Sequence, residues 1–496
     1  MGSDPIYCPA PVLERAALAV LLALILWAPF PLGSNRAWAW AILLSGLFAA
    51  AILWTLAWLR GELRSFGVLR ESWPAFAVLA AWLAYLALFW VPLPSAWVQA
   101  LSPEAARLHH LAAPYAADGG ARAWLSLDPH ASFAFWLKSC GYGTAFFLAI
   151  VLCRRRERVQ LLAYTLVLSG LVQAVYGGLM HLSGADLTVF GTTIPHAAHA
   201  SGGFVNRNHL AGFLELTLAV GIGLMIANLE DTVPRSWRRF ARDLALVVLS
   251  PKAPLRIFLV AMVVALVMTR SRMGNTAFFA SLVMAGIVAL TLSRHATRST
   301  VILIASLIVV DIFIVGAWFG VEKTVQRIEQ TTRRDVEERV DPGVYALDLA
   351  RDYQLFGSGP GTFYTAFTRY RGADILPFYD HAHNDYVQFV TDTGVIGVAL
   401  AGSFALMALV CAVLAQSRRR DRLARGIAFS VVMGVCSIGI HSTVDFNLQI
   451  PANAFVFMLL LALGWVSLYL DRGAKDDASP GARPSRTDAP ASGRDD

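Results

Sequence analysis

Residues 379–398 read YDHAHNDYVQFVTDTGVIGV and join a dense polar cluster directly to a long apolar segment. The N-terminal end of that segment, residues 381–385, is called the mouth. It carries four polar side chains: His381, His383, Asn384 and Asp385. Ionisable groups at the end of a membrane helix are costly unless they face protein or water, so they indicate a functional site. The alternative is that Asn384 or Asp385 merely caps the helix. A helix cap requires only one such residue, and this mouth has four, so capping alone does not account for the cluster.

The composition predicts an all-α, polytopic integral membrane protein. Apolar residues make up 56% of the 496 residues and charged residues 15%, whereas soluble domains have about half and about a quarter. Apolar runs of about 20 residues, long enough to cross a bilayer, predict about twelve transmembrane helices. These runs lie at 14–33, 37–58, 73–93, 133–153, 159–182, 209–228, 256–269, 275–292, 299–319, 385–416, 426–446 and 452–470.

Lys and Arg are distributed unequally between alternate loops. They concentrate in the loops at 60–70, 154–158, 235–256, 294–298 and 418–425. By the positive-inside rule these loops and both termini are cytoplasmic, so the long loop at 320–384 faces outward. The net charge of +7 does not indicate a nucleic-acid binder, because the Arg residues lie in short loops rather than on one amphipathic face.

Four regions follow from these patterns. They are an N-terminal transmembrane bundle at 1–319, an outward-facing helical loop domain at 320–384, C-terminal transmembrane helices at 385–470 and a disordered cytoplasmic tail at 471–496. We expect no cleavable signal peptide, because the first apolar run is a full span. The five cysteines form no CxxC pair, so we expect neither a disulfide framework nor a metal site.

Polar side chains recur on the outward side, beside the predicted helix ends. In addition to the mouth at 381–385, they are Arg207, His209 and Glu215 at the sixth span, Arg270 and Arg272 after the seventh, and His441 and Asp445 near the outer end of the eleventh. This distribution predicts an outward cavity lined by several Arg and at least two His. Arg beside a helix N-terminus suits phosphate oxygens, and His can take a proton from a hydroxyl. The pattern indicates transfer from a diphosphate donor without a metal.

Simpler interpretations stand beside this one. The arginines could extend toward lipid headgroups or anchor a turn at the membrane surface, and His209 could be a packed histidine. His441 and Asp445 are four residues apart, so they are expected on one helical face, where they could hydrogen-bond only to each other. GSGPG at 357–361 predicts a turn rather than a phosphate loop, because no Lys-Ser/Thr follows. Asp311, near the middle of the ninth span, indicates a buried polar partner or a proton path.

The mouth of the tenth span also carries a family resemblance. His383 and Asn384, followed by nine residues and then by Gly394 and Gly397, resemble the H-N-x9-G-x-x-G signature of the O-antigen ligase and polymerase superfamily. Its members are bacterial enzymes that handle polyprenyl-diphosphate-linked glycans. Three further stretches are similar to segments that recur in this superfamily: GGFVNRNHLAGFLE, DYQLFGSGPGTF and HSTVDFNLQIPANA. The resemblance covers approximately residues 200–455.

The resemblance implies an inner-membrane glycosyltransferase of the GT-C type, with a periplasmic loop domain over the active cavity. His383 matches the essential loop histidine of the family and is therefore the expected catalytic base. Family members grip the donor diphosphate with periplasmic arginines, and the matching candidates are Arg207 and either Arg270 or Arg272.

The remaining residues of the predicted site surround His383. His381 is expected to support it or to bind the acceptor, and Asp385 to orient it. Asn384 and His209 complete the predicted substrate-binding set.

The expected reaction moves a glycan from undecaprenyl diphosphate to a sugar hydroxyl on the periplasmic side, with no cofactor and no metal. The acceptor is lipid A core in a ligase, or another lipid-linked glycan unit in an O-antigen or exopolysaccharide polymerase. Membrane lipids are the other expected partners, and no nucleic acid is expected. A lipid-linked oligosaccharide flippase is the third alternative. Transporters place ionisable residues near the midplane between repeats, where Asp311 is nearly the only candidate in this sequence.

Overall fold

The computed structural model describes residues 11–63, 67–112, 114, 122–184, 187–189, 192–194, 199–229, 253–292, 305, 343–372 and 379–470. Within these ranges the secondary structure is almost entirely helical, and eight helices are long and apolar enough to cross a membrane. They are α2 (Ala37–Leu59), α7 (Pro129–Leu152), α8 (Arg156–Ser183), α9 (Arg207–Ala227), α12 (Arg272–Leu292), α16 (Asp385–Arg418), α17 (Arg422–His441) and α18 (Pro451–Tyr469). The predicted all-α, multi-pass membrane fold is confirmed.

Three shorter helices occupy other predicted spans: α1 (Val12–Trp27), α4 (Trp73–Ala87) and α11 (Ala253–Met268). The predicted ninth span at 299–319, with Asp311, lies outside the described residues apart from residue 305. The tail at 471–496 lies outside them as well. The number of about twelve spans, the GT-C arrangement and the four region boundaries therefore stay predictions.

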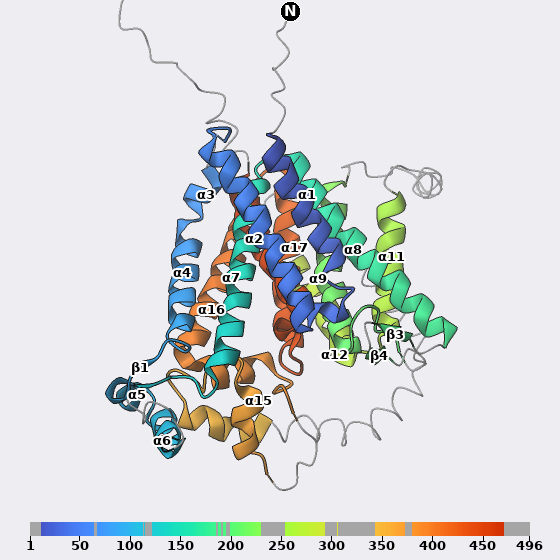
Figure 1. The fold of residues 1–496 in the computed structure, drawn as a ribbon. Coiled ribbons are helices and arrows are strands. Elements are labelled where there is room, and N and C mark those ends of the chain that lie inside the picture. The colour runs from blue at the N-terminus through green and yellow to red at the C-terminus, as the bar shows by residue number, and fades with distance from the viewer. Residues whose placement is uncertain are drawn as a thin grey trace, which may run out of the picture.

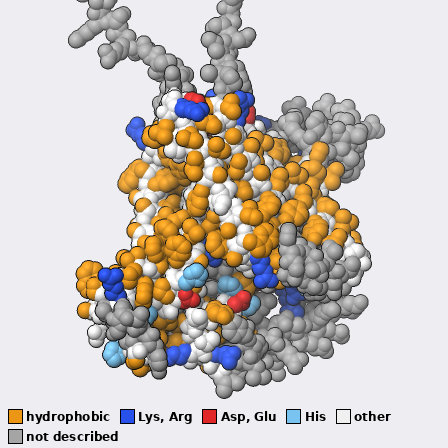
Figure 2. All heavy atoms as spheres, in the orientation of Figure 1, with side chains coloured by type: hydrophobic (Ala, Val, Ile, Leu, Met, Phe, Trp, Pro, Cys, Tyr) orange, Lys and Arg blue, Asp and Glu red, His pale blue; other side chains and the backbone are white. Residues whose placement is uncertain are grey.

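The two ends of the helix bundle carry different loops. Figure 1 shows α3 (Gly67–Glu71) near one end, and α5 (Ser95–Leu101), α6 (Pro103–Ala112) and α15 (Phe363–Ala366) at the other. In Figure 2 hydrophobic side chains form a broad belt between the ends, and charged side chains gather at either end. The segments that the sequence predicts to face outward thus lie together at one end of the bundle.

At the opposite end, a buried carboxylate joins α1 to the connection between α7 and α8. Glu14 is only 2% exposed and pairs with Arg154 and with Arg158, whose Nη1 lies 2.7 Å from Oε1. A carboxylate taken out of water needs such partners, because an unpaired buried charge is strongly destabilising. These two ion pairs therefore fix the Arg-rich loop at 154–158 to the start of α1.

Two helices of the predicted site begin at asparagine caps. The side chain of Asn206 accepts a hydrogen bond from the backbone N–H of Asn208 at the start of α9, at 2.8 Å. The side chain of Asn384 does the same for Val387 at the start of α16, at 3.1 Å. Such caps satisfy backbone donors that the first helical turn leaves free. The predicted capping by Asn384 is therefore observed, and it holds the residue directly after His383.

Helix α16 is broken at Gly394, where the backbone has φ +63° and ψ −176°. The loop domain fills this break: the N–H of Val395 donates to the carbonyl of Gln354 at 2.9 Å, and that of Ser358 to Thr391 at 2.8 Å. A Cβ on Gly394 would lie 2.2 Å from the carbonyl oxygen of Leu355, so this position excludes every other residue. The GSGPG segment forms the predicted turn and packs into the break.

The loop elements at the end of the bundle that is predicted to face outward, together called the outward domain, share a small hydrophobic core. It contains α5, α6, a helix over residues 343–352 and α15, and the rings of Phe363 and Phe367 stack in it at 4.8 Å. Tyr85 on α4 joins this domain to the bundle, because its hydroxyl lies 3.3 Å from the carbonyl oxygen of Phe356 in the loop and 2.6 Å from that of Thr393 on α16. Short elements complete the described fold: the antiparallel pairs β1 (Leu93–Pro94) with β2 (Arg122–Ala123) and β3 (Leu187–Val189) with β4 (Thr192–Ile194), and the 3-10 turns η1 (Leu32–Ser34), η3 (Phe367–Arg369) and η4 (Asn447–Gln449).

We predict that Gly394→Ala lowers the free energy of unfolding by about 2 kcal/mol or more, because the residue has a left-handed backbone and no room for a Cβ. Gly402→Ala on the same helix is the matched control, since nothing lies within 4 Å of a Cβ built there. It should change stability by less than about 1 kcal/mol. Thermal unfolding of both purified variants in detergent measures the effect, and equal midpoints would contradict the role assigned to the break.

Candidate active site

Three histidines from two distant parts of the chain pack around Phe446. This residue lies between α17 and η4. The ring centroid of His209, on α9, lies 4.6 Å from the phenyl centroid, that of His381 lies 4.3 Å from it, and that of His383 lies 4.9 Å from it. The rings of His209 and His383 meet the phenyl ring edge-on, and the ring of His381 stacks on it. The structure thus brings three of the predicted site residues together.

Backbone hydrogen bonds hold the mouth of α16 against the segment that follows α17. The N–H of Asp385 donates to the carbonyls of Ser442, at 2.9 Å, and Asp445, at 3.1 Å. The side-chain amide of Asn384 donates to the carbonyl of Thr443 at 2.8 Å. His383, just before these anchors, has φ +48°, a left-handed conformation that is uncommon outside Gly and that clusters at functional sites. The anchors therefore fix the direction in which the His383 backbone leaves the helix.

Asp385 binds back to the same segment through its carboxylate. Oδ2 accepts hydrogen bonds from Ser442 Oγ at 2.8 Å and from the N–H of Leu448 at 3.1 Å, and Oδ1 accepts one from Gln449 at 3.4 Å. These contacts place Asp385 beneath the mouth as a positioning residue for the segment at 442–449. Its predicted contacts with His383 and with substrate stay predictions.

His381 lies between Phe446 and Gln388. His381 Nδ1 lies 2.9 Å from the amide nitrogen of Gln388 and 3.2 Å from its amide oxygen, and that oxygen accepts the N–H of Ala382 at 3.1 Å. Burial lowers the pKa of His381 to about 4, so the ring is uncharged at neutral pH. A neutral His381 places no positive charge beside His383.

His209 lies beside the buried Asp445. Its Nε2 is 3.5 Å from Asp445 Oδ1, and the carboxylate also accepts hydrogen bonds from the Asn208 side chain and from the N–H of Phe446. Burial alone would raise the pKa of Asp445, but His209 and His441 hold it below its usual range. Asp445 is therefore an anionic partner for a ring that also packs on Phe446.

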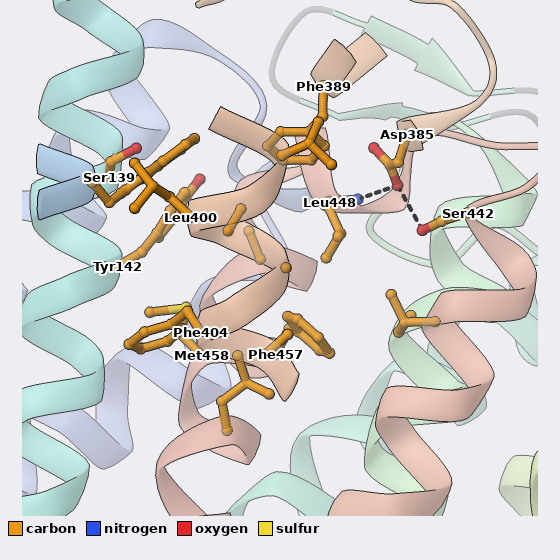
Figure 3. Close-up of a pocket in the computed structure, with 18 of the residues that line it drawn as sticks. Ser139, Tyr142, Asp385, Phe389, Leu400, Phe404, Ser442, Leu448, Phe457 and Met458 are labelled. Atoms are coloured by element: carbon orange, nitrogen blue, oxygen red, sulfur yellow. Dashed lines mark hydrogen bonds between the residues drawn. The ribbon is translucent and has the colours of Figure 1, made fainter. Parts of the chain in front are cut away.

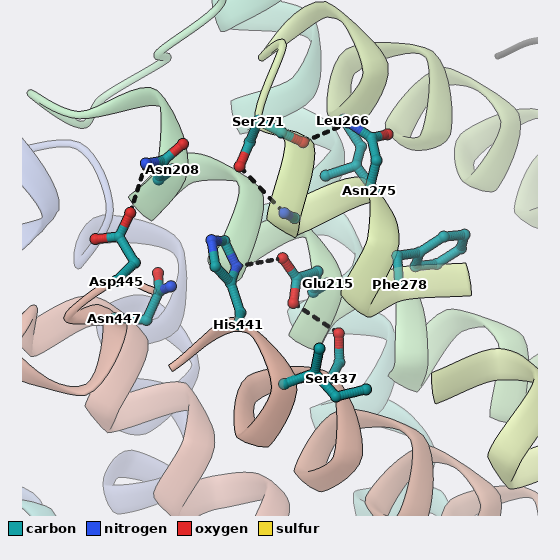
Figure 4. Close-up of polar contacts among 12 residues, drawn as sticks. Asn208, Glu215, Leu266, Ser271, Asn275, Phe278, Ser437, His441, Asp445 and Asn447 are labelled. Atoms are coloured by element: carbon teal, nitrogen blue, oxygen red, sulfur yellow. Dashed lines mark hydrogen bonds and ion pairs between the residues drawn. The ribbon is translucent and has the colours of Figure 1, made fainter. Parts of the chain in front are cut away.

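A second buried polar cluster joins α9 to α17, and Figure 4 shows Glu215 beside His441 and Ser437. His441 Nδ1 lies 2.7 Å from Glu215 Oε1, and Ser437 Oγ donates to Glu215 Oε2 at 2.6 Å. All three side chains are fully buried. The expectation that His441 and Asp445 share a helical face is wrong, because α17 ends at His441 and the chain turns before Asp445. The hydrogen bond of His441 is therefore to Glu215 on α9. The spacing of His441 and Asp445 along the sequence could not indicate this partner.

The three predicted arginines lie at or beside the starts of two helices, α9 and α12. Arg207 is half-buried and is the first residue of α9, two residues before His209. Arg270 and Arg272 are exposed and flank Ser271 in the turn between α11 and α12. Helix N-termini carry partial positive charge and free N–H groups, so arginines placed there suit an anionic group.

Packing joins the two arginine-bearing helix starts. A Cβ on Gly274, near the start of α12, would lie 2.7 Å from the Cβ of Ala211 on α9 and 3.2 Å from Glu215 Oε1. The N–H of Ala200, in the segment that leads to α9, donates to the carbonyl of Met268 at 3.1 Å. Arg270 and Arg272 therefore extend from a turn that is bound to the approach to α9. In Figure 2 acidic, basic and His side chains gather around a hollow below the hydrophobic belt.

Together these groups describe a site for proton transfer beside an anion. Histidine rings gather at the mouth, and the starts of α9, α12 and α16 lie at the same end of the bundle. Sequence reasoning found His383, His381 and His209 but missed Phe446 as their common neighbour. Within the described ranges, no group of three or more His, Cys, Asp and Glu side chains is arranged to hold a metal ion.

Comparison with known proteins gives one finding. Residues 257–402 match the model of a protein family described as O-antigen ligase. No curated protein matches the chain. The matched range contains Arg270, Arg272 and the whole stretch from His381 to Gly397, and it ends within α16. The resemblance that the sequence predicted is thereby confirmed.

We predict that His381 makes the fold sensitive to acid. The pKa of His381 in the folded chain, about 4, lies below the ordinary value of 6.5. Between these values the unfolded chain binds more protons, so stability falls as the pH drops from about 6.5 to about 4, by up to about 1.4 kcal/mol per pH unit. His381→Asn should flatten this slope.

Thermal unfolding in detergent at several pH values measures the slope. Because the substitution also changes the baseline stability, slopes rather than midpoints are compared. His110→Asn is the control, since His110 is exposed on α6 and should leave the slope unchanged. A His381→Asn slope equal to that of the unsubstituted chain would contradict the buried, neutral state of this ring.

Proposed function

We propose that the chain, whose residues 257–402 match the O-antigen ligase family model, transfers a glycan from a polyprenyl diphosphate to a sugar hydroxyl. The family match supports a ligase- or polymerase-type glycosyltransferase in a membrane. The observation that carries the finer proposal is the position of His383, which packs on Phe446 together with His209 from the turn of α9 that Arg207 begins. His383 as the base and Arg207 as the residue that binds the diphosphate then act at the same site.

The proposed step is a single displacement. His383 takes the proton of the acceptor hydroxyl as its oxygen bonds to the anomeric carbon of the donor sugar. The bond from that carbon to the diphosphate oxygen breaks at the same time, its electron pair leaves with the diphosphate, and the anomeric configuration inverts. Arg207, with Arg270 or Arg272, stabilises the charge on the leaving group through paired N–H donors. The step uses no cofactor and no metal.

The neighbours of His383 have supporting roles in this scheme. Neutral His381 is proposed to form a hydrogen bond with a hydroxyl of the acceptor. Asp385 and Asn384 hold the mouth in place through their bonds to the segment at 442–445. His209, paired with Asp445, is proposed to bind the donor near its diphosphate.

We place this site on the periplasmic side of the bacterial inner membrane, with both termini in the cytoplasm. The support is the unequal distribution of Lys and Arg between the two sets of loops. The proposed acceptor is lipid A core, which makes the protein a ligase. A polymerase uses the same donor chemistry and a second lipid-linked unit as acceptor, so reconstitution with both acceptors decides between the two.

We predict that His383→Ala loses transfer by about 100-fold or more, because general base catalysis contributes about 10² to 10⁴. The assay uses purified protein, defined undecaprenyl-linked donor, either acceptor, and excess EDTA, since the proposed step needs no metal. His110→Ala, an exposed histidine outside the mouth, should keep full activity. Full activity of His383→Ala would remove the proposed base, and inhibition of the unsubstituted enzyme by EDTA would remove the metal-free step.

The same variant separates an enzyme from a flippase in cells. A blocked enzyme leaves the undecaprenyl-linked donor on the outer leaflet, whereas a blocked flippase leaves it on the inner leaflet. Accumulation on the inner leaflet in His383→Ala cells, at an unchanged protein level, would favour the transport function instead.

We predict that Arg207→Lys loses most of the transfer activity, by about tenfold or more, because lysine keeps the charge but lacks the planar pair of donors that matches a diphosphate. Arg122→Lys is the control, since Arg122 is exposed in β2 of the outward domain. Initial rates at several donor concentrations measure the effect. Full activity of Arg207→Lys would show that its guanidinium does not grip the donor.

A further inference from the structure

A cavity of about 310 Å³ lies directly beneath the mouth of α16. It is lined by α4, α7, both halves of α16, α17 and α18, and its wall is mostly apolar. In Figure 3 Asp385 and Ser442 lie at one end, and Phe404, Phe457 and Met458 lie well away from them. The volume falls in the range of about 300 to 1,000 Å³ that is usual for small-molecule sites. The cavity thus starts at the candidate active site and continues into the bundle as a hydrophobic space.

Lys138 is the one Lys or Arg side chain among the described residues that line this cavity. It belongs to α7, a helix that qualifies as a membrane span, and its nearest aromatic neighbour is Phe135, with Nζ 5.8 Å from the ring centroid. Within the described part of the chain, no hydrogen bond or ion pair holds the ammonium group. A lysine within a membrane helix is energetically costly and is usually functional. A ligand that supplies a negative charge would offset this cost.

Lys138 lines the same cavity as Asp385 and Ser442, which belong to the mouth of α16 and to the segment that the mouth contacts. An anionic group beside Lys138 would therefore lie close to the cluster of histidines. An apolar chain attached to that group would have the cavity directly below it.

From this geometry we infer that the cavity binds a segment of the isoprenoid chain of the donor, and that the Lys138 ammonium group is a counter-ion for its phosphate groups. This inference rests on the proposed function, which supplies a donor with one apolar chain and an anionic head. Charge complementarity at Lys138 and the apolar wall select for that combination. The arginines of α9 and α12 then approach the diphosphate from the other side of the mouth.

The test measures binding without transfer. Undecaprenyl phosphate, which carries no sugar, is titrated into the purified full chain in detergent, and bound lipid is quantified by native mass spectrometry. Lys138→Met should weaken binding by about tenfold, since a charge-assisted contact is lost, whereas Lys138→Arg should stay within about threefold of the unsubstituted chain.

A second variant reduces the volume of the cavity instead of its charge. Gly402 lines the cavity and has open space where a Cβ would lie, so Gly402→Phe should fill the space and also weaken binding by about tenfold. Leu406→Phe is the matched control on the same helix, because Leu406 is 58% exposed and does not line the cavity. This control should bind like the unsubstituted chain.

Competition distinguishes the isoprenoid from ordinary membrane lipid. Phosphatidylglycerol at equal concentration should not displace undecaprenyl phosphate from the unsubstituted chain; equal competition would overturn the inference, because the cavity would then hold bulk lipid. Undiminished binding by both Lys138→Met and Gly402→Phe would overturn it as well. If the unsubstituted chain transfers glycan while these variants bind normally, the lipid site is wrong and the proposed function stands. If these variants lose binding but the unsubstituted chain transfers nothing, the proposed function is wrong.

Discussion

The break in α16 is the constraint on which the site depends. A membrane helix satisfies its backbone hydrogen bonds internally, so a break within it is tolerated only where protein or water supplies the missing partners. Here the loop domain supplies them, through Gln354 to Val395 and through Ser358 to Thr391. The first half of α16 can therefore diverge from the second and present His383 at its start. The loop that contains Gln354 and Ser358 is thus an integral part of the candidate site.

The sequence predicts those parts of the fold that depend on local composition, such as the positions of the membrane helices. Apolar runs located the membrane helices, because a span must be long and apolar whatever it packs against. The polar cluster at 381–385 could be recognised for the same reason, since its four polar residues are unfavourable in lipid. The role of Phe446 could not be predicted, because it depends on α9 and α17 packing side by side. The pairing of His441 with Glu215, 226 residues away, required the same information.

Charge is distributed through the described bundle according to its surroundings. Glu14 and Glu215 are buried, and each is paired with cationic or hydrogen-bonding partners. His381 avoids the cost of burial by staying neutral, as its lowered pKa shows. Lys138 differs in its contacts, because no hydrogen bond or ion pair holds it in the described part of the chain and it adjoins an apolar cavity. That difference distinguishes it from the residues whose role is to stabilise the bundle.

The spacing within the signature has a mechanical explanation. The nine residues between Asn384 and Gly394 form about two and a half helical turns, roughly 13 Å in length. Asn384 caps this half-helix at the mouth, and Gly394 ends it where the loop domain enters. Gly397 then allows close packing, since a Cβ there would lie 2.3 Å from Thr393 Oγ1 and 3.2 Å from Tyr85. The gap thus fixes the distance between the outward domain and His383, so an inserted or deleted residue would rotate His383 away from Phe446.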